Sequence, residues 1–127
     1  MIMMFENLQD KVLDWAESKG IIDNSTPLKQ LEKTQEELDE TMQALTKIED
    51  LHSQDNLPFV DVGNKQALRD QYNEEVVDGI GDMLVTIIIL AEVSGFDAVE
   101  CLRVAYAEIK DRKGEMRDGL FVKEENL

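Results

Sequence analysis

The stretch EEVVDGIGDMLVTIIILAEV, residues 74–93, decides the fold class. It starts with acidic side chains, becomes apolar on nearly every side, and ends before Ser94 and Gly95, which is the pattern of a central, covered helix. We expect Asn73 to cap this helix, which should span about residues 74–94. At 127 residues with 43% hydrophobic side chains, the chain is long enough for one domain with its own core.

Three further segments with helical periodicity flank this central helix. Thr26 followed by Pro27 is typical of a helix start, and Gly20 of a helix end. No strand-like alternation of useful length appears. We therefore expect an all-α four-helix bundle in one domain, residues 1–127, with the other helices over about 4–19, 27–49 and 97–114, a loop at 50–72 that includes a short turn near 66–72, and a short C-terminal tail.

Apolar side chains three and four residues apart predict the inward faces of these helices. On helix 27–49 they are Leu28, Leu31, Leu38, Met42 and Leu45, and on helix 97–114 they are Val99, Leu102, Tyr106 and Ile109. We expect Phe5, Trp15 and Cys101 to be core residues as well, and His52 to be a solvated loop residue. Ile2, Met3, Phe5 and Ile48 exceed what so short a bundle can cover, which favours a homo-oligomer.

The charge of the chain excludes several classes of function. With 13 basic and 28 acidic residues the net charge is −15, which repels nucleic-acid phosphates. The lone Cys101 excludes an internal disulfide framework. No apolar run approaches the length that spans a membrane, and no signal segment is recognisable. We expect a reduced, cytoplasmic protein that binds neither nucleic acid nor membrane.

Acidic side chains are concentrated on two of the expected helices. Glu36, Glu37 and Glu40 share one side of helix 27–49, because residues three and four apart are neighbours on a helix. Taken alone, this cluster is typical of a solvated face, which Lys29 and Lys33 neutralise in part.

The acidic residues of the central helix point more clearly to a site. Glu75, Asp78 and Asp82 fall within an arc of about 60°, and the same stripe continues as Val85 and Ile89. A face that is apolar downstream should be covered, and covered carboxylates need a counter-charge. Without histidine or thiol nearby, these hard oxygen ligands suit Mg²⁺ or Mn²⁺ rather than zinc or a di-iron centre. The alternative is an acidic patch open to water at the helix N-terminus.

Basic residues cluster at the end of the last expected helix, as Lys110, Arg112 and Lys113. Cations at a helix C-terminus are favourable in any case, because they complement the helix dipole. The functional alternative is a phosphate clamp that faces the metal-bound carboxylates. Both roles are compatible.

These residues resemble a known family. LEKTQEELDETMQAL (31–45) is similar to the Glu-Glu-x-x-Glu signature of the MazG-type all-α nucleoside triphosphate pyrophosphohydrolases, and residues 74–97 resemble its Glu-x-x-Asp helix. DWAESKGI (14–21) also looks similar. EIKDRKGEMRDGLFVKE (108–124) resembles the basic C-terminal part of small, phage-associated members.

The resemblance implies Mg²⁺-dependent hydrolysis of a nucleoside triphosphate between its α and β phosphates, on a helical bundle that assembles as a homodimer or homotetramer. By position, Glu37 and Glu40 match the metal ligands of the first motif. Glu36 or Glu40 would orient water and accept its proton.

The second motif departs from the usual phase of the family. The position three residues before Asp82, where the family often has Glu, is Gly79. The literal match lies one turn upstream, at Glu75 and Asp78, so we expect these two to bind metal with Asp82 assisting. Nothing in the sequence indicates which base is bound.

Two other functions remain open from the sequence. One is a non-enzymatic acidic helical protein whose carboxylates mimic DNA phosphates and occupy a basic partner. The other is a pyrophosphohydrolase of phosphoribosyl nucleotides, which the histidine-biosynthesis enzymes on the related fold suggest.

Overall fold

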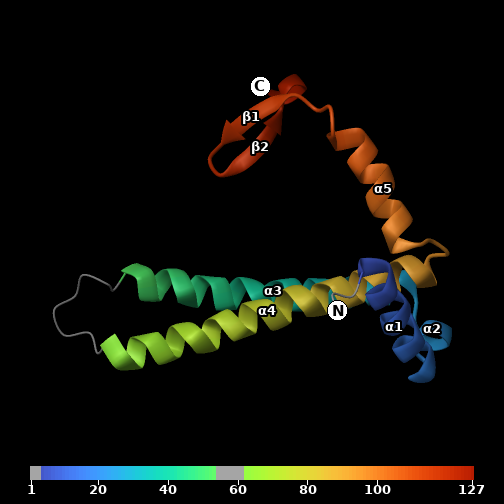
Figure 1. Ribbon diagram of the computed structural model, residues 1–127, viewed down its shortest axis with the longest axis horizontal. Coiled ribbons are helices and arrows are strands. Elements are labelled where there is room, and N and C mark those ends of the chain that lie inside the picture. Colours follow the sequence, from blue (N-terminus) through green and yellow to red (C-terminus); the bar gives the residue numbers. More distant parts are fainter. Residues whose placement is uncertain (1–3, 54–61) are drawn as a thin grey trace.

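The computed structural model describes residues 4–53 and 62–127, and Ile2 and Met3 lie outside them. The described chain is mostly helical, as expected, and ends in a small β-hairpin (Figure 1). Helices α3 (Pro27–Ser53) and α4 (Val62–Val93) lie side by side and form the body of the molecule.

Both long helices extend into the segment expected to be a loop. The start of α3 is as predicted, because the Thr26 hydroxyl accepts a hydrogen bond from the Lys29 N–H at 3.2 Å. However, α3 continues to Ser53 and α4 begins at Val62, so Asn73 lies inside a helix and caps nothing. Packing of two helices against each other stabilises helical turns that the local pattern does not mark.

The face of α3 that packs on α4 is not the predicted leucine stripe. The buried α3 residues are Glu37, Thr41, Ala44 and Leu51. The two helices lie in close contact at Gly79, where an added Cβ would overlap the Thr41 hydroxyl. The stripe from Leu28 to Leu45 is exposed instead, with Leu38 41% and Met42 59% accessible. The apolar periodicity is present, but no part of the chain described in residues 4–53 and 62–127 covers this stripe.

Two short helices cover the end of the body where α4 finishes. Helix α1 (Phe5–Ser18) packs on α4 through the buried Gln9 and Ala16. Gly20, with a φ of 76°, ends it as predicted. A single helical turn, α2 (Ile21–Asn24), follows and was not predicted.

The last helix, α5 (Ala98–Ile109), leaves the body and has no buried residue. Asp97 is the N-cap residue of α5, but its carboxylate accepts a hydrogen bond from the Gln9 amide of α1 rather than from its own helix. A 3.7 Å ion pair between Arg103 and Glu6 also joins α5 to α1. The predicted inward face is exposed, Leu102 and Tyr106 each by 61%, and Cys101 is exposed as well.

Beyond α5 the expected helix end and tail are replaced by a β-hairpin. Strands β1 (Gly114–Arg117) and β2 (Leu120–Lys123) pair antiparallel, with Glu115 opposite Val122. The turn between them consists of Asp118 and Gly119, both with positive φ, as in the two-residue turns that match strand twist. An Asp-Gly pair is the sequence signal that marks such a hairpin.

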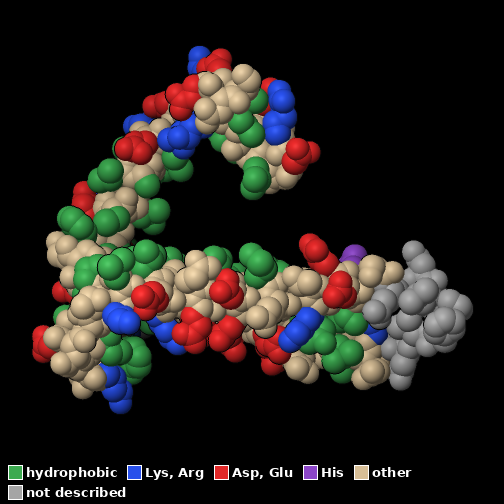
Figure 2. Space-filling view, turned by 180° about the vertical axis from the view of Figure 1, so that it is seen from behind, with side chains coloured by type: hydrophobic (Ala, Val, Ile, Leu, Met, Phe, Trp, Pro, Cys, Tyr) green, Lys and Arg blue, Asp and Glu red, His purple; other side chains and the backbone are tan. Residues whose placement is uncertain are grey.

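Residues 98–127, which we call the arm, run over one side of the body and leave an open space between the hairpin and the α3–α4 pair (Figures 1 and 2). The described part of the chain therefore does not form the expected four-helix bundle by itself. None of the helices described in residues 4–53 and 62–127 is long and apolar enough to cross a membrane.

Candidate functional site

Five of the predicted carboxylates line one cavity between α3 and α4. We call it the carboxylate cavity, and its volume is about 260 Å³. Its walls are Glu37, Glu40, Gln43 and Lys47 from α3, and Glu75, Asp78, Gly79 and Asp82 from α4. The antiparallel packing of the two helices thus joins the two acidic motifs that the sequence placed 35 or more residues apart.

Glu37 is the most enclosed carboxylate of the cavity, at 8% exposure. Burial, followed by the neighbouring charges of Glu40 and Asp82, raises the pKa of its carboxyl above the ordinary glutamate value. Lys33 opposes this shift, since its ammonium lies 3.5 Å from a Glu37 oxygen. A site that raises an acid's pKa in this way favours a cation placed among the carboxylates.

Lysines stand at both ends of the carboxylate cavity. Lys33 contacts Glu36 at 3.3 Å, and Lys47 lies 3.9 Å from Glu75. The Lys47 ammonium also lies 5.4 Å from the centre of the Tyr72 ring. The sequence reasoning missed Lys47, although it continues the face of Glu40 and Gln43 at spacings of three and four.

The donor set fits a hard divalent cation in its chemistry. Carboxylate oxygens without histidine or thiol are what Mg²⁺ and Mn²⁺ prefer. Within residues 4–53 and 62–127, no three acidic, histidine or cysteine side chains converge closely enough to hold an ion as they stand. The side chains would have to move inward around a bound ion, and Asp78 and Asp82 are exposed and free of packing that would prevent it.

Glu36 is not brought into the cavity. Its side chain is exposed, is paired with Lys33, and is absent from the cavity walls. Of the two predicted proton acceptors, Glu40 lies in the cavity wall and Glu36 beside it.

Gly79 occupies the position three residues before Asp82, where the sequence departs from the pattern it resembles. Gly79 lies where α4 touches Thr41, so a glutamate side chain has no room there. Glu75 and Asp78, one turn upstream, line the cavity together with Asp82.

A second cavity adjoins the first and is mostly apolar. Its volume is about 480 Å³, and it shares Glu37 and Asp82 with the carboxylate cavity. The remaining wall residues are Trp15, Ile21, Lys29, Gln30, Lys33, Val85, Thr86 and Ile89. The prediction that Trp15 is a core residue is therefore wrong, because its ring is 49% exposed and faces this cavity. We call this space the Trp15 cavity.

The predicted phosphate clamp lies elsewhere in the chain. Lys110 follows the end of α5, and Arg112 and Lys113 connect it to β1. Arg112 and Lys113 line a separate hollow at the base of the hairpin, together with Lys123, Glu108, Asp111, Glu124 and Glu125. Within one chain, the arm holds these cations far from the carboxylate cavity (Figure 1).

His52, expected in a loop, is on α3 and exposed.

Comparisons of the chain with protein-family models, with curated proteins and with solved structures find no match.

Proposed function

We propose that this protein is a Mg²⁺-dependent hydrolase that cleaves a nucleoside triphosphate to a nucleoside monophosphate and pyrophosphate. The observation that carries this proposal is the carboxylate cavity, in which acidic residues of two helices line one space that opens onto a mostly apolar one. A nucleotide has the same two parts, a polyanionic end that needs metal and a planar, less polar end.

The carboxylates that would hold Mg²⁺ are Glu37 and Glu40 of α3 with Glu75, Asp78 and Asp82 of α4. A Mg²⁺ held by these carboxylates would supply charge neutralisation for the phosphates and activation of a water molecule. Glu40, at the more exposed edge of the cavity, accepts the proton of the attacking water. Lys33 and Lys47 lie beside these carboxylates and offer positive charge to phosphate oxygens that enter the cavity.

The nucleoside end of the substrate fits the Trp15 cavity. An aromatic ring that is half exposed and faces a hollow is available for stacking on a base. Gln30 in the same wall offers its side-chain carbonyl as an acceptor, since its amide nitrogen donates to the Ser25 hydroxyl at 2.8 Å. Because Glu37 and Asp82 belong to both cavities, one molecule can occupy both, with its phosphates next to the carboxylates.

A DNA-mimicking acidic protein is the rival function, and it calls for a different distribution of charge. A mimic spreads its carboxylates over exposed faces, as a substitute for a phosphate backbone. Here an acidic residue is enclosed at 8% exposure with a raised pKa, in a hollow that also contains lysines. That arrangement favours the enzyme.

The decisive experiment incubates the protein with Mg²⁺ and a panel of canonical and modified nucleoside triphosphates, together with phosphoribosyl nucleotides, and separates the products. We expect a monophosphate and pyrophosphate from at least one triphosphate. If only the phosphoribosyl nucleotides released pyrophosphate, the protein would be a phosphoribosyl-nucleotide pyrophosphohydrolase instead. No turnover of any compound would contradict the proposal and favour the acidic decoy.

Metal binding is tested separately by calorimetry. We expect Glu37→Gln combined with Asp78→Asn to abolish Mg²⁺ binding and the thermal stabilisation that Mg²⁺ gives the wild type. Glu49→Gln combined with Glu74→Gln removes the same charge from the same two helices outside the cavity, and should leave both unchanged. Equal Mg²⁺ affinity in the two double variants would mean that the site is assigned to the wrong residues.

A further inference from the structure

The two sides of the α3–α4 pair differ in character. One side bears the carboxylate cavity, and the other bears a row of exposed apolar side chains that we call the apolar face. Its members are Leu31, Leu38, Met42 and Leu45 of α3 with Ile80, Leu84 and Ile87 of α4. In Figure 2, hydrophobic side chains line the edge of the body that faces the arm, and most acidic side chains lie along the opposite edge.

Helix geometry explains this division. At 100° per residue, the exposed stripe of α3 lies about a third of a turn from its contact with α4, and the stripe of α4 lies slightly further from its contact with α3. Because the helices are antiparallel, both stripes turn to the same side. Glu40 and Asp78 are displaced in the other direction, which places the carboxylate cavity on the far side of the pair.

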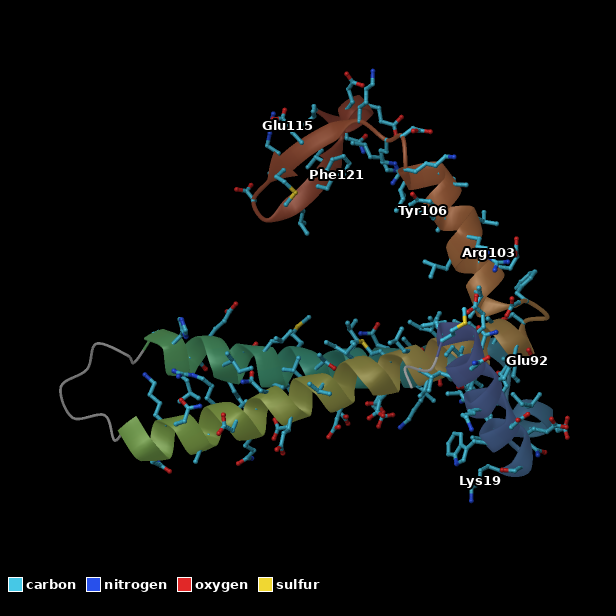
Figure 3. The ribbon with its side chains drawn as sticks, viewed as in Figure 1. Lys19, Glu92, Arg103, Tyr106, Glu115 and Phe121 are labelled. Carbon is cyan, nitrogen blue, oxygen red and sulfur yellow. The ribbon has the colours of Figure 1, made fainter. Side chains whose placement is uncertain are left out.

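The arm faces the apolar face without touching it. Tyr106 lies on the inner side of α5 and Glu115 on the outer edge of the hairpin (Figure 3). Leu102, Tyr106 and Ile109 form a second exposed apolar stripe, each more than half exposed. The space between arm and body is therefore open and bordered by apolar side chains on both sides (Figure 2).

The chain exposes more area than a compact monomer of its mass. It exposes 9732 Å², whereas a compact monomer of the same mass exposes about 6900 Å². The excess of about 2800 Å² is at least as large as the area of about 1000–2500 Å² that each partner of an obligate dimer commonly buries.

The basic side chains of the arm are concentrated in its segment 110–123. This segment contains five basic and three acidic side chains, whereas the whole arm contains six basic and seven acidic ones, and residues 1–97 contain seven basic and 21 acidic ones. The strongly acidic body of a second copy is thus a surface that segment 110–123 attracts.

We propose that the arm is exchanged between two copies of this chain, so that the body of one copy fills the space beneath the arm of the other. The two apolar faces pack together, and α5 lies along the partner's body. Since the carboxylate cavity lies opposite the apolar face, the hairpin of each copy then reaches the partner's carboxylate cavity and brings Arg112 and Lys113 to it. This extends the proposed function, because each site combines carboxylates of one copy with cations of the other.

The exchange itself is tested without activity, first by sedimentation. The wild type should be a dimer at micromolar concentration. Leu102→Glu puts a carboxylate on the inner stripe of α5 and should give a monomer. Val104→Glu puts the same group about half a turn away and should leave the dimer intact. A wild-type monomer, or a dimer that survives Leu102→Glu, would overturn the proposal.

Zero-length carbodiimide cross-linking then distinguishes exchange from a simple face-to-face dimer. A mixed dimer is prepared from unlabelled and ¹⁵N-labelled chains. We expect Lys110, Lys113 or Lys123 to be joined to carboxylates of α3 or α4. In the informative peptide pairs, one peptide is ¹⁵N-labelled and the other is unlabelled, so the two come from different chains. Cross-links of these lysines only within a single chain would contradict the exchange.

Active-site complementation tests the shared site. Glu40→Gln, and Arg112→Ala combined with Lys113→Ala, should each lose ten- to a hundredfold or more in kcat/KM. A heterodimer of the two variants, purified through two different tags, contains one intact site under exchange and should recover about half the wild-type activity. Activity no higher than that of either variant alone, or full activity of the arm variant, would overturn the shared site. A wild type without nucleotide turnover would refute the proposed function alone, and sedimentation and cross-linking would still decide the exchange.

Discussion

Gly79 sets how closely α3 and α4 approach each other. A Cβ at this position would lie 3.1 Å from the Cβ of Thr41 and overlap its hydroxyl. We expect Gly79→Ala to lower the free energy of unfolding by about 1–3 kcal/mol, the usual cost of adding atoms to a packed contact. Urea unfolding measures the change, and adding Thr41→Ala to the same chain should recover most of it.

Gly81 is the matched control on the same helix. A Cβ there meets nothing within 4 Å, so Gly81→Ala should be neutral or should stabilise by up to about 1 kcal/mol through better helix propensity. If Gly79→Ala and Gly81→Ala lowered the free energy of unfolding by similar amounts, the contact of Gly79 with Thr41 would not be the cause of the loss.

Glu37 should make stability depend on pH. Its folded-state pKa is raised above the ordinary value of 4.5, mainly by burial and then by Glu40 and Asp82. The unfolded chain therefore loses this proton at a lower pH than the folded one, and the free energy of unfolding falls as the pH rises through the interval between the two values. Glu37→Gln should stabilise the metal-free protein above that interval and have no such effect below pH 4.5. Thermal unfolding in EDTA at several pH values measures this, and a constant difference across pH would contradict it.

Spacing along the helix predicted most acidic residues that line the carboxylate cavity, because the helical period alone brings Glu75, Asp78 and Asp82 to one face. Spacing alone did not predict that Glu36 lies outside the cavity or that Lys47 lines it. Which side chains of α3 face the cavity depends on how α3 is rotated about its axis relative to α4. That rotation is a property of the helix pair, in contact at Gly79, and cannot be derived from one helix alone.

At the scale of elements, α1 and α2 hold Trp15 against the body. We expect Trp15→Ala to raise KM for the nucleotide about tenfold, as loss of a stacked ring does, with little change in kcat. Phe5→Ala removes another exposed aromatic ring of α1 that lies outside the cavity walls and should leave KM unchanged. A fall in kcat with constant KM would remove Trp15 from substrate binding.

The end of α1 and the start of α3 followed from local signals, while the end of α3 and the start of α4 did not. Gly20 and the Thr26–Pro27 pair act within a few residues of the chain, so their effect is visible in the sequence. The extension of α3 and α4 beyond their predicted ends depends on their mutual packing. The hairpin was missed because its strands have four residues each, too short for alternation to show, although Asp118 and Gly119 carried the turn signal.

At the scale of the whole molecule, an apolar stripe predicts a covered face but not which chain covers it. The stripes of α3 and α5 were expected to build one bundle, and each is exposed within the chain. If two copies exchange arms, both stripes are buried as the periodicity requires, in an assembly that the sequence of one chain does not specify.

The arm also has a consequence for the order of folding. Contacts between α3 and α4 join neighbouring parts of the chain, and such contacts form quickly and at any dilution. The arm has few contacts with the body of its own chain, so under the proposed exchange its docking has to wait for an encounter with a second copy. After rapid dilution out of denaturant, we expect circular dichroism to show a fast phase of helix formation whose rate is independent of protein concentration. A dye on the exposed Cys101 should report a slower phase whose rate doubles when the protein concentration doubles. A dye signal with the same rate at every concentration would place the arm's contacts within its own chain. If the arms are exchanged, newly made copies finish folding only when they meet, and the time that each spends incompletely folded is set by the protein concentration around it.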